Sequence, residues 1–294
     1  MTQNIISIVN QKGGVGKTAS SVNLAACLAH LKKRVLLIDL DYQANASSYF
    51  GKKIEAKKEN KSISVALMKK KSLKDVIFTT QDKNLDIIAA DMGLIEITIE
   101  KALIPGSIFM LKKLLQKEAT EYDVIILDTR PSIDLLFSIS LAAANTYLLP
   151  IFPEADPFDG LQIVFDQVMQ IQDSSVNPEL QFLGILITKY DAKNSTHKKF
   201  LPLIKDFARE NKIKINGIIP NTTAIAGSSS SQKPLIWYNP VLDVTKAYMQ
   251  VAKNLINDFK NVNQGKLSSV VPKKIRTPND IIDLFSQAEG VVSL

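Results

Sequence analysis

The feature that most constrains this fold is the alternation of short apolar runs with stretches of helical periodicity. The apolar runs show no polar alternation, as is typical of strands buried on both faces, and they fall at residues 5–9, 35–38, 85–89, 124–127, 147–152, 182–187 and 215–219. Helical patterns lie between most of them, at residues 18–31, 108–118, 135–143, 158–171, 201–211 and 241–259. We therefore expect an α/β fold with a doubly wound, mostly parallel sheet and helices on both faces.

The pattern contains no internal repeat and indicates one domain over residues 1–260. From about residue 261 the chain becomes polar and then basic, and residues 277–280 (TPND) are typical of a helix start. We read residues 261–294 as a basic linker with a short C-terminal helix. The serine run at residues 228–231, which follows Gly227, predicts a mobile loop.

Composition excludes several classes of protein. The single cysteine, Cys27, rules out a disulfide framework and a cluster held by several cysteines, and two histidines offer little for a zinc centre. No apolar run approaches the roughly 20 residues of a membrane span. No signal peptide is visible at the N-terminus, so we expect a cytoplasmic protein.

The net charge of +7 is unevenly distributed along the chain. Residues 1–188 carry 20 basic and 21 acidic side chains, whereas residues 189–276 carry 16 basic and 5 acidic ones. The last 18 residues hold three acids and no base. A basic C-terminal third is the pattern of a polyanion-binding protein, although lysines spread over a solvated surface would give the same count.

The strongest motif is the segment KGGVGKT at residues 12–18, between the first predicted strand and the first predicted helix. Glycines let backbone N–H groups approach phosphate oxygens, and the helix N-terminus faces the same anion. Lys17 would neutralise the β and γ phosphates, and the Thr18 hydroxyl would ligate Mg²⁺. The standard spacing asks for glycine where this chain has Gln11, and an additional lysine, Lys12, opens the loop instead.

Three acids stand at the ends of predicted strands, where ligands bind in such sheets. Asp128 follows four apolar residues and is placed to hold a water on Mg²⁺, or else to cap a neighbouring helix. Asp39 would be either a metal ligand or a structural partner of the loop. Asp41 completes the group.

The loop resembles the deviant Walker A motif of the ParA/MinD family, and further segments support a ParA/Soj-type partition ATPase. These segments are residues 35–45 (VLLIDLDYQAN), 124–132 (VIILDTRPS), 184–191 (GILITKYD) and 218–221 (IIPN). The resemblance extends from about residue 4 to 260 and implies a P-loop ATPase that uses ATP and Mg²⁺.

The resemblance also implies residue roles. Asp41 orients the attacking water, and Lys12 reaches across an ATP-sandwich homodimer to the phosphates of the other subunit, so that Lys12, Lys17 and Asp41 form the catalytic set. The ATP-binding residues would be Lys12, Gly13, Gly14, Val15, Gly16, Lys17, Thr18, Ala19, Thr188, Pro220 and Asn221. Thr18 and, through water, Asp128 would hold the metal. Weak intrinsic hydrolysis is expected.

The family function implies a nucleoid-associated protein that binds DNA non-specifically. A ParB-like activator would stimulate its ATP hydrolysis, and this cycle would segregate plasmid or chromosome DNA. Candidate DNA-facing lysines are Lys189, Lys193, Lys198, Lys199, Lys246 and Lys253. Dimerisation would double the phosphate contacts and so couple ATP to DNA binding.

Four positions depart from the usual family text. Ala19 stands where a second threonine is common, and Tyr42 and Arg130 each replace a proline. Arg130 would assist charge neutralisation near the γ-phosphate or bind a partner. The segment after Pro220 lacks the arginine that usually contacts DNA, which puts the usual DNA surface in doubt.

Three other functions share parts of this sequence pattern. A MinD-like membrane ATPase needs a basic amphipathic C-terminal helix. All charged side chains in residues 277–294 are acidic, so membrane binding is not expected. A ParA-like ATPase that positions a protein cargo would share the same core. A nitrogenase-reductase-like protein needs cluster cysteines that this chain lacks.

Overall fold

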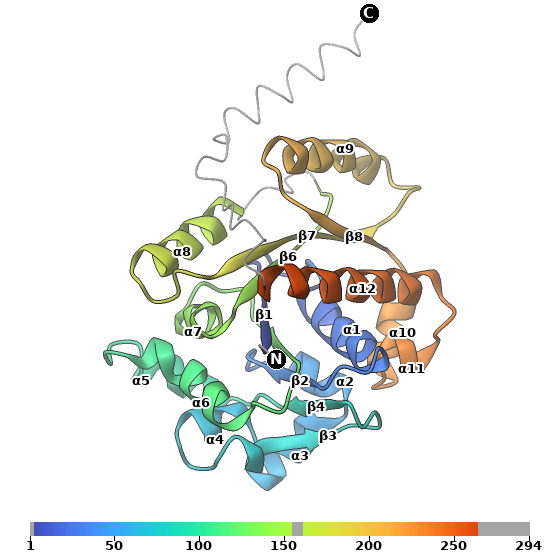
Figure 1. The fold of residues 1–294 in the computed structure, drawn as a ribbon. Coiled ribbons are helices and arrows are strands. Elements are labelled where there is room, and N and C mark those ends of the chain that lie inside the picture. The colour runs from blue at the N-terminus through green and yellow to red at the C-terminus, as the bar shows by residue number, and fades with distance from the viewer. Residues whose placement is uncertain (1–2, 155–160, 264–294) are drawn as a thin grey trace, which may run out of the picture.

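The computed structural model describes residues 3–154 and 161–263, and these form a sheet of eight strands between two layers of helices (Figure 1). The strand order is β3-β4-β2-β5-β1-β6-β7-β8, and every neighbouring pair is parallel except β3 with β4. The strands are β1 (Asn4–Ile8), β2 (Val35–Asp39), β3 (Ile77–Thr79), β4 (Leu85–Ile88), β5 (Val124–Asp128), β6 (Thr146–Ile151), β7 (Gln181–Tyr190) and β8 (Ile215–Pro220). The predicted doubly wound α/β fold is confirmed.

The helices cover both faces of this sheet because each strand is apolar on both sides. They are α1 (Lys17–His30), α2 (Asn45–Tyr49), α3 (Lys52–Glu59), α4 (Ile63–Leu67), α5 (Gly93–Glu100), α6 (Met110–Glu118), α7 (Leu135–Ala143), α8 (Leu161–Asp173), α9 (Ser195–Glu210), α10 (Ala224–Ser230), α11 (Leu235–Tyr238) and α12 (Asp243–Asn263), with 3₁₀ turns η1 (Lys74–Val76) and η2 (Ser107–Phe109). One core cluster joins the sheet to α4–α9, and the other joins it to α1, α11 and α12.

Alternation along the strands divides the side chains between these two cores. Ile5 and Val9 of the first strand segment belong to the core under α4–α9, whereas Ile6 and Ile8 belong to the core under α1 and α12. Strands β2, β5 and β1 are neighbours, so their carboxyl ends meet at one edge of the sheet. This edge is where Asp39, Asp128 and the loop after β1 come together.

Most predicted strands and helices are confirmed, while α9 begins at Ser195, six residues before its predicted start, and short helices such as α5 and α11 lie outside the predicted helical segments. Two further features differ. The short edge strand β3 is antiparallel and was not anticipated. The serine run is not a loop: Ser228 to Ser230 form the end of α10 and Ser231 is its C-cap, and the Ser228 hydroxyl donates to the Ile225 carbonyl (2.9 Å). Gly227 packs closely on Tyr238, since an added Cβ would lie 2.8 Å from the tyrosine oxygen. This tertiary packing overrides the loop preference of serine.

The predicted linker and C-terminal helix fall almost wholly on residues 264–294, which lie outside the described residues. Helix α12 continues through residue 260 to Asn263. No helix within the described ranges combines the length and the apolar character that crossing a bilayer requires.

Candidate phosphate-binding site

The loop between β1 and α1 has the backbone geometry of an anion cradle. Gly14 and Gly16 have φ of +74° and +82°, in the left-handed region that disfavours other residues. Gly16 caps α1, and no side chain accepts a hydrogen bond from the first turn of this helix. The free N–H groups and the positive end of α1 therefore face the loop, as phosphate binding requires.

Buried hydrogen bonds hold this loop in place from behind. The Asn10 amide donates to the Pro150 carbonyl (2.7 Å), and its oxygen accepts from the Lys12 backbone N–H (2.9 Å). The Thr188 hydroxyl is directed at the carbonyl oxygens of Val15 (2.7 Å) and Ile151 (3.0 Å). The loop is thus tied to β6 and β7 before any ligand arrives, which lowers the entropy lost on binding.

Lys17 is only 6% exposed, and its ammonium group donates to the Lys12 carbonyl (2.9 Å). Burial lowers the pKa of Lys17 to about 8, against the opposing pull of the Asp128 and Asp41 carboxylates. A polyanion in the cradle would restore the charged form, so this lysine is suited to a phosphate ligand.

Asp128 is fully buried, and its two oxygens have different surroundings. Oδ1 accepts from the Ser21 hydroxyl (2.7 Å), whereas Oδ2 has no hydrogen-bond partner. Burial raises the pKa of Asp128 and the nearby Asp39 adds to the rise, while the Ser21 and Thr18 hydroxyls and the Lys17 ammonium oppose it. A buried oxygen without a partner is costly, and a cation or its water shell would satisfy it.

Asp39 is fully buried but fully engaged by the chain itself. Oδ2 accepts from the Ser47 backbone N–H (2.8 Å) and hydroxyl (2.7 Å), and Oδ1 accepts from the Asp41 backbone N–H (3.1 Å). Burial raises the pKa of Asp39, and these hydrogen bonds oppose the rise. Of the two roles considered for Asp39, the geometry favours the structural one.

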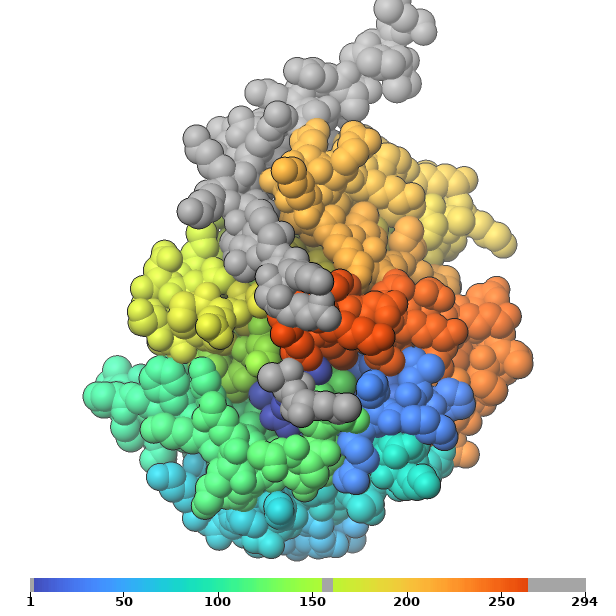
Figure 2. Space-filling view, in the orientation of Figure 1, coloured from blue at the N-terminus to red at the C-terminus, as the bar shows by residue number. Residues whose placement is uncertain are grey.

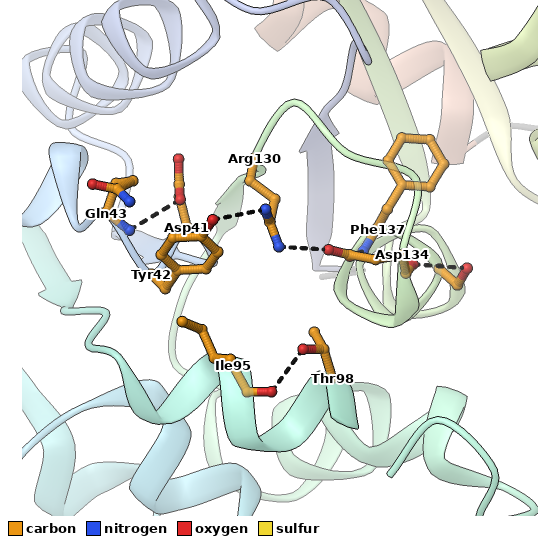
Figure 3. Close-up of polar contacts among 9 residues, drawn as sticks. Asp41, Tyr42, Gln43, Ile95, Thr98, Arg130, Asp134 and Phe137 are labelled. Atoms are coloured by element: carbon orange, nitrogen blue, oxygen red, sulfur yellow. Dashed lines mark hydrogen bonds and ion pairs between the residues drawn. The ribbon is translucent and has the colours of Figure 1, made fainter. Parts of the chain in front are cut away.

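The cradle opens into a cavity of about 460 Å³ at the ends of β2, β5 and β7. Its lining consists of Gly14, Gly16, Lys17, Thr18, Ala19, Asp41, Tyr42, Gln43, Asn45, Thr129, Arg130, Pro131 and Lys189. The Asp41 carboxylate is held in a turn by the Gln43 backbone N–H (3.0 Å), as Figure 3 shows. Asp41 and Thr18 line this cavity together with Lys17.

The oxygen donors at this site suit Mg²⁺, which needs few protein ligands, better than a metal that is coordinated entirely by protein side chains. No group of three His, Cys, Asp or Glu side chains capable of holding a metal occurs in residues 3–154 and 161–263. Magnesium keeps several waters and takes oxygen ligands from one or two protein groups and from substrate phosphates. Of the two residues predicted to hold the metal, Thr18 lines the cavity, whereas Asp128 is fully buried and is not among the lining residues.

Some predicted nucleotide-binding residues lie apart from the cavity. Thr188 is 2% exposed and supports the loop from behind, so its hydroxyl is occupied by loop and strand carbonyls. Pro220 and Asn221 lie at the end of β8 and do not line the cavity. The Asn221 backbone N–H donates instead to the Tyr190 carbonyl at the end of β7 (2.7 Å). Lys12 forms an ion pair with Glu154 (3.1 Å) at the mouth of the loop.

The six lysines predicted to face DNA fall in three places. Lys189 lines the nucleotide cavity, and its ammonium lies over the Phe152 ring (5.7 Å to the centroid). Lys193, Lys198 and Lys199 lie in and beside the first turn of α9. Lys246 and Lys253 lie on α12, which packs on the other face of the sheet from α9 (Figure 1). In the space-filling view both helices reach the visible surface, α9 in gold and α12 in red-orange (Figure 2). The predicted DNA-facing lysines thus come from the cavity wall and from two helices that cover opposite faces of the sheet.

The sequence reading missed the hydroxyls that serve the buried carboxylates. Ser21 lies one helical turn after Lys17 and reaches Asp128, while Ser47 reaches Asp39 from eight residues away. The available signal was the cluster of serines next to the two motifs. That signal alone does not say which carboxylate each serine contacts.

Comparison with known proteins agrees with this geometry. The profile of the AAA domain family matches residues 3–182. The sporulation initiation inhibitor protein Soj of Bacillus subtilis is 35% identical over 85% of this chain and 97% of its own length. The chromosome partitioning protein ParA of Myxococcus xanthus is 31% identical over 86% of this chain and 87% of its own length.

Solved structures share the fold. A plasmid partition protein from Borrelia burgdorferi superimposes with a TM-score of 0.70 at 26% identity, over 88% of this chain and 100% of its own. The loop, the strand-end carboxylates and these similarities together lead to one conclusion: the chain belongs to the ParA/Soj family of P-loop ATPases.

Proposed function

We propose that this protein is a partition ATPase that binds ATP with Mg²⁺, forms an ATP-sandwich dimer on DNA and hydrolyses ATP to ADP and phosphate. The proposal rests on one observation: two buried groups, Lys17 and Asp128, lie near the N-terminus of α1, which Gly16 caps. Oδ2 of Asp128 has no hydrogen-bond partner. A Borrelia burgdorferi structure 25% identical to this chain holds the ATP analogue AMPPNP.

Each group at the cavity has a defined task. The loop N–H groups and Lys17 hold the phosphates, and Thr18 and Asp128 would hold Mg²⁺, which neutralises charge on the β and γ oxygens when bound. Asp41 lines the same cavity and orients the attacking water by accepting a hydrogen bond from it. Phosphoryl transfer needs mainly positioning and charge neutralisation, so one carboxylate at this place is sufficient.

Lys12 is the lysine that would act on the partner's phosphates. Its ion pair with Glu154 is half-exposed, with side chains 33% and 44% accessible, so it contributes little stability and yields readily to a stronger anion. Exchange of Glu154 for a triphosphate of a second subunit would complete both sites at once. Hydrolysis then depends on dimerisation.

The exposed lysines of α9 and α12 would bind DNA phosphates without reading sequence. A dimer carries two copies of each lysine group, so lysines separated within one subunit are brought into a larger basic array. Partition of plasmid or chromosome DNA follows if a ParB-like partner stimulates hydrolysis and releases the dimer.

The test is retention of the protein on non-specific DNA as a function of ATP and salt, with anionic liposomes as the competing surface. We expect the protein to be retained on DNA only with ATP and Mg²⁺, and the retained fraction to decrease steeply as the salt concentration increases. Retention on liposomes instead would favour a membrane ATPase. Retention on neither surface, with ATP hydrolysis intact, would favour a protein cargo and reject DNA partition.

A further inference from the structure

The side chain of Arg130 bridges two loops at the wall of the nucleotide cavity (Figure 3). Its guanidinium carbon lies 4.3 Å from the centroid of the Tyr42 ring, and Nη2 donates to the Tyr42 hydroxyl (3.0 Å). Nη1 donates to Asp134 Oδ2 (2.9 Å). Tyr42 is 88 positions from Arg130 in the chain and Asp134 is 4 positions from it, so Arg130 joins the loop after β2 to the loop after β5.

Asp134 anchors this bridge to the body of the protein. Its other oxygen, Oδ1, accepts from the Phe137 backbone N–H (3.1 Å) and caps the N-terminus of α7. Arg130 is 22% exposed and Asp134 20%, so water competes only partly for their ion pair. On the same loop, the Thr129 hydroxyl donates to the Ile8 carbonyl (2.7 Å), which fixes the base of the loop to β1.

Tyr42 stands at the other end of the bridge, directly after Asp41 in the chain. Hydrogen bonds at Asp41 run from the Gln43 N–H to Asp41 Oδ1 (3.0 Å), from the Ala44 N–H to the Asp41 carbonyl (2.7 Å) and from the Asp41 N–H to Asp39 Oδ1 (3.1 Å). Ala44 has a φ of +55°, a conformation that costs energy for a residue other than glycine. Two side chains from outside contact this turn: Lys53 Nζ donates to the Gln43 carbonyl (2.7 Å), and Arg130 donates to the Tyr42 hydroxyl next to Asp41.

We propose that Arg130 and Tyr42 form a clamp that positions Asp41 for hydrolysis, with Arg130 acting as a positioning residue through Tyr42. This inference rests on the proposed ATPase function. The guanidinium is planar and stacks on the ring while donating at both ends, a combination that lysine does not reproduce. Loss of the clamp leaves the phosphate loop intact but allows Asp41 to move relative to it.

A direct role is the competing explanation, because Arg130 lines the cavity and carries charge. If Arg130 bound the nucleotide itself, its removal would weaken ATP binding, and Tyr42 would not matter. If it acts through Tyr42, both residues affect the turnover rate and neither affects ATP affinity. The two explanations therefore differ in the split between kcat and KM.

The experiment compares Arg130→Gln, Tyr42→Ala, the double variant and Arg130→Lys in the full chain, without DNA. The expected result is a kcat about tenfold lower in each single variant, because a small displacement of a positioned group costs a large part of its effect. KM for ATP stays within about twofold, and the double variant is no slower than the singles, because the two residues act as a unit. Arg130→Lys does not restore kcat.

The matched control is Arg209→Gln, which removes an arginine paired to an aspartate (Asp206, 2.9 Å) on the surface of α9. It is expected to leave kcat unchanged. Thermal unfolding of each variant shows whether the chain still folds, and Tyr42→Phe, which keeps the ring and loses one hydrogen bond, provides a milder variant of the same contact.

A second readout does not depend on hydrolysis. Hydrogen exchange of the Gln43 and Ala44 amides in the nucleotide-free chain should become faster in Arg130→Gln and in Tyr42→Ala, and not in Arg209→Gln. Unchanged exchange, additive effects on kcat, or an increase in KM confined to Arg130 variants would each overturn the clamp. Absence of hydrolysis in the unaltered protein would reject the proposed function, while the exchange measurement would still decide on the clamp.

Discussion

The lysines of the nucleotide cavity and those of α9 and α12 have the same chemistry and opposite settings. Lys17 is buried, its charge is destabilised by burial, and its ammonium is fixed on the Lys12 carbonyl. Lys198 and Lys253 are exposed at the surface of their helices. A desolvated lysine is committed by the fold to one anion at one place, whereas exposed lysines gain affinity only through their number.

The largest expected effect is at Lys17. Replacement by alanine leaves the cradle without its buried cation, a loss on the order of 3–5 kcal/mol and hence at least about a hundredfold in ATP affinity. Titration with a fluorescent ATP analogue measures it. Lys12→Ala is the matched control, because Lys12 lies in the same loop but is half-exposed and paired with Glu154. ATP affinity in a single subunit should be nearly unchanged by it, and equal effects of the two variants would contradict the contrast between buried and exposed lysine.

The next effect is at Asp41. Asp41→Ala should lower the rate of hydrolysis by about a hundredfold or more, because one positioned carboxylate orients the attacking water. ATP affinity should stay within a few fold, so the ATP-bound dimer accumulates, as light scattering with ATP and Mg²⁺ would show. A monomer under these conditions would separate Asp41 from the dimer cycle and contradict the assignment.

The contrast between local and long-range features also explains which parts of the site could be predicted from the sequence. The phosphate loop and the carboxylates of Asp39 and Asp128 were predicted because each stands at a strand end, where the local pattern fixes its place. The stack of Arg130 on Tyr42 joins residues 88 positions apart, so no local pattern could reveal it. The positions of both residues were noted only as departures from the usual family text.

The surface lysines were less predictable for a related reason. Their number is evident from the sequence, but their grouping depends on which face of the edge strand β8 each helix covers. Helices α9 and α12 cover opposite faces, so lysines counted together are separated in space. The helical serine run likewise depended on the contact between Gly227 and Tyr238, which is a tertiary contact.

The exposed lysines should show effects that depend on number and on salt. Replacing Lys198 and Lys199 by alanine removes up to four phosphate contacts from a dimer, so the slope of log affinity against log salt should decrease by about 2 to 4. The corresponding change of Lys246 and Lys253 tests whether α12 faces DNA as well. Affinity should decrease about tenfold at moderate salt in whichever pair faces DNA, as filter binding would measure.

The control for these variants is the adjacent pair Lys112 and Lys113 on α6, which carries the same charge on another part of the surface. An equal decrease in the salt slope for all three pairs would show that net charge alone governs binding. A decrease for one pair only would identify the helix that faces DNA.

The smallest effect concerns the proton on Lys17. Its pKa is lowered from 10.5 to about 8 by burial, so between these values the unfolded chain holds a proton that the folded, nucleotide-free chain does not. The free energy of unfolding should therefore increase as pH is raised through this window. Bound triphosphate favours the charged lysine, so ATP binding should take up a proton, and affinity should decrease about threefold between pH 7.5 and 8.5.

Calorimetric titration at pH 8.5 in two buffers of different ionisation enthalpy measures this proton directly. Lys17→Arg is the matched control, because a guanidinium stays protonated throughout this range and should bind ATP without proton uptake. If the original protein also took up no proton, Lys17 would already be charged in the empty cradle. The buried and the exposed lysines would then differ only in position, since the cost of desolvation would have been met by Asp128 and Asp41 before ATP arrives.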